Sequence, residues 1–136
     1  MTSRLFSALA LALATSVAVS AHHAAAGIDR TKTVELKGTI KAFSWQNPHS
    51  WMEVDVVDEQ GKVVTWTVEM TAPSYLVRAG WKASTVKPGD EVRVSVRPLK
   101  NGDPGGLFVS VTLADGRTLT ERPVLAQAAP APAPVQ

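Results

Sequence analysis

The residues best suited to chemistry in this chain are its three histidines. His22 and His23 are adjacent, and His49 ends the tripeptide Asn47-Pro48-His49. Neutral imidazole is a common metal ligand. If an export signal were removed just before the histidine pair, the free terminal amine would add another nitrogen donor. The sequence therefore predicts a candidate copper site that uses His22, His23 and His49.

The first 21 residues are typical of an export signal. Arg4 supplies a positive start, and residues 5–14 (LFSALALALA) form a short apolar stretch of the expected length. Residues 19–21 (VSA) carry small or compact side chains at the −3 and −1 positions, which favours cleavage before His22. The apolar stretch is too short to span a bilayer, so we expect a periplasmic or secreted protein without a transmembrane segment.

The cleavage position decides which copper geometry is expected. If His22 comes first, its amine and imidazole chelate one ion, and His49 completes a T-shaped set of three nitrogens that suits Cu(I) or Cu(II). If Ala21 comes first, His23 becomes the third residue. Its imidazole, the amine and two backbone amides then form a square-planar set for Cu(II) or Ni(II). The alternative is a solvated terminus that binds nothing, with the His49 ring bonded inside its own turn.

Two tryptophans flank the same tripeptide. Trp45 and Trp51 lie on either side of Asn47, and the three side chains form a candidate surface for a small ligand or an envelope partner. Tryptophan is more often used for its buried area, so the two indoles could instead cover one end of the domain. Trp66 is expected in the core.

Composition excludes several classes of protein. There is no cysteine, so neither disulfides nor a lipid anchor on cysteine can contribute. The chain has 14 Lys and Arg against 12 Asp and Glu, a net charge of +2 that falls to +1 once Arg4 is removed with the signal. Carboxylates expected on an outer strand face would repel a phosphate backbone, which argues against nucleic acid; these are Glu53, Asp55 and Glu69. No common hydrolase or metalloprotease motif is present, so we expect a non-enzymatic protein, with a copper-dependent oxidase or oxygenase as the alternative.

Alternation of apolar and polar residues predicts an all-β fold. A turn at 58–61 joins the second and third strands into a hairpin, and residues 72–81 are expected to form a short helix that packs Leu76 and Val77 on the sheet. The expected strands are 34–42, 51–56, 64–70, 91–97, 107–113 and a short 118–121. This order predicts a small OB-like barrel of five or six strands, with one short helix between strands 3 and 4. A β-sandwich is the alternative.

The fifth strand and the domain limits complete these expectations. The fifth strand should turn every second residue inward, namely Leu107, Val109, Val111 and Leu113.

We expect a signal peptide at 1–21, a flexible mature N-terminus at 22–30, the barrel at 31–124 and an Ala/Pro-rich disordered tail at 125–136.

Several segments resemble a family of small exported bacterial proteins of unassigned function. They are the His22-His23 pair, the Asn47-Pro48-His49 tripeptide, and Gly80-Trp81 followed by Lys87-Pro88-Gly89-Asp90. The resemblance implies an exported address and this fold, and it implies no activity. Two hypotheses follow from the residues: a periplasmic binding module that holds copper, or a metal-free structural or interaction domain that presents Trp45 and Trp51 to a partner.

Overall fold

The structure is a computed structural model that describes residues 27–122. The predicted signal at 1–21, the histidines at 22 and 23 and the tail at 125–136 lie outside the described residues. Within them the elements are β1 (Val34–Ser44), β2 (Trp51–Val57), β3 (Val63–Glu69), α2 (Pro73–Arg78), β4 (Glu91–Pro98), β5 (Gly105–Leu113) and β6 (Thr118–Thr120). No helix between residues 27 and 122 is long and apolar enough to cross a bilayer.

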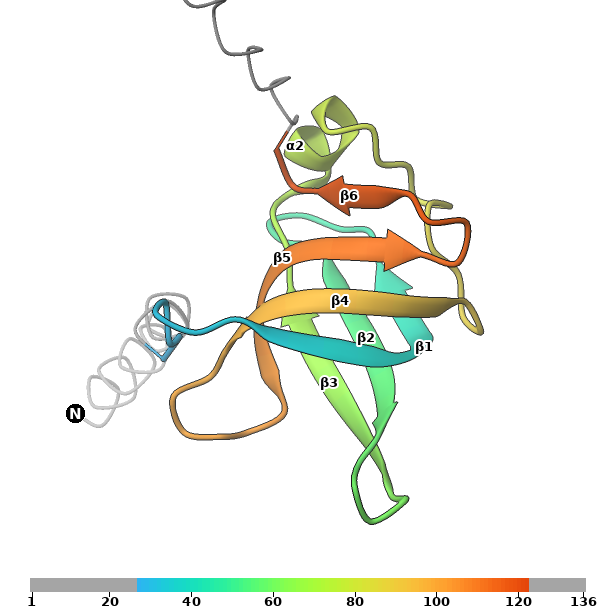
Figure 1. Cartoon of the computed structure of the whole chain (residues 1–136). Coiled ribbons are helices and arrows are strands. Elements are labelled where there is room, and N and C mark those ends of the chain that lie inside the picture. Colours follow the sequence, from blue (N-terminus) through green and yellow to red (C-terminus); the bar gives the residue numbers. More distant parts are fainter. Residues whose placement is uncertain (1–26, 123–136) are drawn as a thin grey trace, which may run out of the picture.

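The first five strands close into a barrel (Figure 1). β1 pairs with both β2 and β4 in antiparallel fashion, β2 pairs with β3, and β4 with β5. A short parallel pairing of β3 with β5 closes the ring. β6 adds an extra strand to β5, and α2 lies between β3 and β4 in the chain. The predicted OB-like barrel, with its single short helix, is confirmed.

A core composed mainly of branched aliphatic side chains fills the barrel. Alternate positions of β4 supply three of them, since Val92, Val94 and Val96 are all buried as predicted. Trp66, expected in the core, is only half buried and packs against its margin.

β5 departs from strict alternation. The pairing with β4 skips one position, because Ser95 faces Ser110 while Val96 faces Phe108. The extra residue, Val109, is a β-bulge, and a bulge reverses which side chains point inward. Phe108 is therefore buried, while Leu107 and Val109 are half exposed. The prediction that Leu107 and Val109 face inward was wrong.

The helix is shorter than predicted and turns one expected side chain outward. Leu76 is fully buried, but Val77 is 59% exposed, because a helix of only six residues has a narrow inward face. Gly80, at φ +90°, ends the segment in the left-handed conformation that glycine tolerates. Trp81 then enters the core, and its Nε1 donates a hydrogen bond to the Thr120 carbonyl, 2.8 Å away.

Candidate functional site

His49 lies on the loop between β1 and β2, and its neighbour fixes its place. Ser50 is completely buried. Its backbone N–H donates to the Thr71 carbonyl at 3.2 Å, and its carbonyl accepts from the Met70 N–H at 2.9 Å. The peptide between Asn47 and Pro48 is cis. The backbone beside His49 is thus bound to the end of β3, while the ring itself stays at the surface.

The His49 ring contacts a carboxylate through one of its two nitrogens. Nδ1 faces the Glu69 Oε1 in a direct hydrogen bond. The His49 side chain is 51% exposed and that of Glu69 only 15%. An ionised carboxylate only accepts hydrogen bonds, so Nδ1 is the donor in this bond, and Nε2 is the ring nitrogen that does not contact Glu69.

Strand register explains why these two residues meet. Trp51 of β2 pairs with Glu69 of β3. His49 is two residues before Trp51 along the same chain, so it occupies the diagonal position on the same face. Diagonal neighbours are within reach of long side chains across an antiparallel pair.

A surface hollow of about 240 Å³ opens beside this pair. His49 and Glu69 form one wall, and Arg97 of β4 and Leu107 of β5 form another. Phe108 and Glu121 also line it. The hollow therefore brings together the ends of β3 and β4, the start of β5 and the residue that follows β6.

Glu121 is the most perturbed carboxyl group near this hollow. Burial raises the pKa of Glu121 above its ordinary value, and the nearby charge of Glu69 acts in the same direction. The Thr71 N–H, which donates to Glu121 Oε1 at 2.6 Å, opposes the rise in pKa, as do Arg122 and His49. A carboxyl group in this position is costly to ionise.

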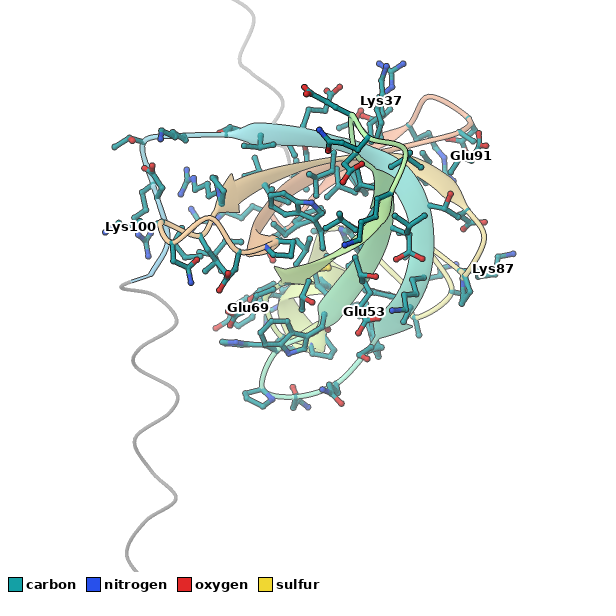
Figure 2. All side chains as sticks on the ribbon, turned by 90° about the horizontal axis from the view of Figure 1, so that it is seen from below. Lys37, Glu53, Glu69, Lys87, Glu91 and Lys100 are labelled. Atoms are coloured by element: carbon teal, nitrogen blue, oxygen red, sulfur yellow. The ribbon has the colours of Figure 1, made fainter. Side chains whose placement is uncertain are left out.

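The described chain begins close to the same part of the barrel. The Gly27 carbonyl accepts a hydrogen bond from the Lys100 N–H at 2.8 Å, and the Asp29 N–H donates to the Pro98 carbonyl at 2.8 Å. Figure 2 shows Lys100 and Glu69 toward one side of the barrel, away from Lys87. His22 and His23, the other predicted ligands, precede this anchored segment and lie outside the described residues.

The predicted tryptophan surface is divided between two environments. Trp45 packs edge-on against Phe43, with ring centroids 5.8 Å apart, and covers the margin of the core. Trp51 is half buried on the outer side of β2, and Asn47 is exposed on the loop. Trp51 and Asn47 therefore remain available at the surface near His49, whereas Trp45 mainly covers the barrel end.

The histidine and the two carboxylates do not make a metal site by themselves. Among residues 27–122, no group of three or more His, Cys, Asp or Glu side chains is arranged to hold a metal ion. A metal bound at His49 would need further donors from outside this part of the chain.

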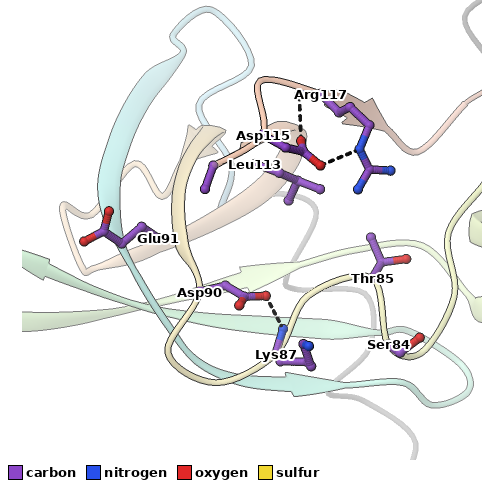
Figure 3. A pocket seen from close by; sticks show the side chains of 9 residues that line it. Ser84, Thr85, Lys87, Asp90, Glu91, Leu113, Asp115 and Arg117 are labelled. Carbon is purple, nitrogen blue, oxygen red and sulfur yellow. Dashed lines mark hydrogen bonds and ion pairs between the residues drawn. The ribbon is translucent and has the colours of Figure 1, made fainter.

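A second hollow, of about 320 Å³, lies at the turns near β4 and β6 (Figure 3). Two of its three acidic side chains, those of Asp90 and Asp115, are already engaged. Asp115 binds the Arg117 Nε at 2.7 Å, and Asp90 accepts from the Lys87 N–H at 2.8 Å. These bonds stabilise the turns, and the histidine hollow is the better candidate for binding.

Glu69, Arg97 and Glu121 were not predicted as site residues. The sequence comes within one residue of predicting Glu69. Counting outward from the expected turn at 58–61 places Trp51 opposite Val68, but the ladder begins with Asp58 bonded to Lys62, so that Trp51 pairs with Glu69. Arg97 and Glu121 reach the hollow only because the barrel closes, and no local sequence pattern predicts barrel closure.

The closed barrel places this protein among small β-barrels of OB-like topology. A family model described as a family of unknown function (DUF6152) matches residues 10–109, and the chain therefore belongs to that family. The matched range includes the histidine pair and most of the barrel. No curated protein and no solved structure matches the chain. The expected membership of a family without an assigned function is confirmed, while the importance of the individual motifs stays a prediction.

Proposed function

We propose that this protein is an exported, non-enzymatic binding module that holds one copper ion between its processed N-terminus and His49. The ion would be bound by the terminal amine and imidazole of His22 and by the His49 ring. The observation that carries the proposal is the state of His49: a half-exposed ring with one nitrogen bonded to Glu69 and no hydrogen-bond partner for the other among residues 27–122.

The length of the chain before Gly27 supports contact between the N-terminal donors and His49. Five residues, 22–26, precede Gly27, and five extended residues span at most about 17 Å. Gly27 is bonded to Lys100. Lys100 lies three residues, or roughly 10 Å along a strand, beyond Arg97, and Arg97 lines the His49 hollow. The N-terminal donors are thus within reach of the hollow.

The chemistry of the donor set favours copper. Three nitrogen donors in one plane leave an open position and suit Cu(II) and Cu(I), whereas structural zinc sites are usually tetrahedral with four protein ligands. Carboxylate-rich sites suit calcium or magnesium, but Glu69 is occupied by His49 and Glu121 by the Thr71 N–H.

The test is a Cu(II) titration of protein exported natively, with the intact mass recorded on the same sample. We expect a one-to-one complex of sub-micromolar affinity and a mass that shows His22 first. His49→Ala should weaken binding, while Gln46→Ala on the same exposed loop should leave it unchanged.

Two results would overturn the proposal in different ways. A tight complex that His49→Ala does not weaken would indicate a purely terminal chelate through His22 or His23. Absence of any stoichiometric binding would refute the copper function. The alternative function would remain, a metal-free envelope domain that presents Trp51 to a partner. Trp51→Ala, and not the histidine variants, would then abolish its interaction.

A further inference from the structure

We infer that Glu69 is a positioning residue that holds the His49 imidazole in its Nδ1–H tautomer, so that Nε2 is the donor atom presented to the metal. The inference rests on the proposed function for the identity of the metal. The tautomer itself is a property of the metal-free protein and can be examined separately.

Glu69 is well suited to hold a ring in place because its own backbone is fixed on both sides. It pairs with Trp51 of β2 in antiparallel fashion and with Leu107 of β5 in parallel fashion. Few residues of the barrel belong to this three-strand junction. The Glu69 side chain therefore extends from a backbone that is held by a strand on each side.

Burial strengthens the same bond. The Glu69 side chain is only 15% exposed, so water competes weakly for its oxygen. A hydrogen bond to an ionised acceptor in such a place is stronger than one between neutral groups in water. The His49 ring, by contrast, is half exposed, and His49 lines the hollow.

The consequence for metal binding follows from the chemistry of imidazole. A metal-bound histidine commonly donates its other ring N–H to a carboxylate, which fixes ring orientation and makes the ligating nitrogen more basic. Loss of that partner typically weakens metal binding by about 10- to 100-fold. Here the partner is already in place, so the ring is oriented before the ion arrives.

The first experiment is ¹⁵N NMR of the metal-free protein, which reports the proton on each ring nitrogen of His49. We expect Nδ1–H in the wild type and a shift toward Nε2–H in Glu69→Ala, with Glu69→Gln between the two. The matched control is Glu53→Ala, on the outer face of β2, whose carboxylate lies 3.7 Å from the Lys41 Nζ. This control should leave the His49 signals unchanged.

The second experiment is a Cu(II) titration of the same variants. Glu69→Ala should weaken binding about 10- to 100-fold, Glu69→Gln should restore part of the loss, and Glu53→Ala should have no effect. An unchanged tautomer in Glu69→Ala would overturn the inference, as would an unchanged copper affinity. A tautomer shift in a protein that binds no copper would confirm that Glu69 orients His49 and would refute the copper function instead.

Discussion

Glu121 lies just beyond the last strand, and its side chain bonds to a segment that is distant in the sequence. Its Oε1 accepts from the Thr71 N–H at 2.6 Å, and this bond ties the end of β6 to the segment between β3 and α2. Burial raises the pKa of this carboxyl group above its ordinary value. The folded protein therefore favours the protonated form, and the stability that Glu121 contributes is present at acidic pH and lost as pH rises through its folded-state pKa.

Glu121→Gln should consequently stabilise the protein in a pH-dependent way. Glutamine keeps an oxygen for the Thr71 N–H but cannot ionise, so the variant avoids the cost of burying a charge. We expect the difference in melting temperature, variant minus wild type, to be smallest near pH 4 and to grow toward neutral pH. Thermal unfolding with a chelator present measures it. A difference that does not vary with pH would contradict the raised pKa.

At the scale of elements, α2 is held to the barrel by one of its own side chains and by Trp81, three residues beyond its end. Leu76 is fully buried, and Trp81 packs near the rings of Phe43 and Phe108, at centroid distances of 6.1 and 5.6 Å. Val77 and Tyr75 point to solvent. A helix of six residues is not stable alone, so these contacts, and not helix propensity, keep α2 in place.

Two neighbouring residues of α2 offer a matched pair of substitutions. Leu76→Ala should lower the free energy of unfolding by about 2–5 kcal/mol, because it leaves a cavity in a packed core. Val77→Ala should change it by no more than about 0.5 kcal/mol, as expected of an exposed side chain. Urea denaturation of both variants provides the comparison. Equal losses would mean that the helix docks on a different face.

Much of this element order could be predicted from the sequence, because alternation and turn residues are local signals. Bulges are not. Val109 carries no mark that sets it apart from other β-branched strand residues, and its insertion turns Phe108 inward. The bond between His49 and Glu69 joins residues 20 positions apart, so it depended on the register of the hairpin and not on either residue's neighbours.

At the scale of the whole molecule, closure of the barrel builds the candidate site. β3 meets β5 through three residue pairs, and one of them is Glu69 with Leu107. The close approach of β4 to β5 requires Gly106. A Cβ there would lie 2.3 Å from the Arg97 carbonyl oxygen, so the strands would have to move apart. Glycine at this position therefore keeps Arg97 and Glu69 around one hollow.

Gly106→Ala should weaken closure and disturb the site together. The forced shift of backbone is a case of overpacking, for which we expect a loss of about 1–3 kcal/mol in unfolding free energy. Lys37→Ala, on the exposed side of β1, is the control and should stay within about 0.5 kcal/mol. Urea denaturation gives both values. A Gly106→Ala variant as stable as the wild type would show that β4 and β5 can separate at this point without cost.

The central claim is that the His49 ring is a copper ligand together with the N-terminus. Electron spin-echo envelope modulation of the Cu(II) complex tests it most directly, because each coordinated imidazole contributes a signal from its remote nitrogen. We predict two coordinated imidazoles in the natively processed protein and one in His49→Ala. Identical modulation in the two proteins would contradict the claim and confine any copper to the terminus.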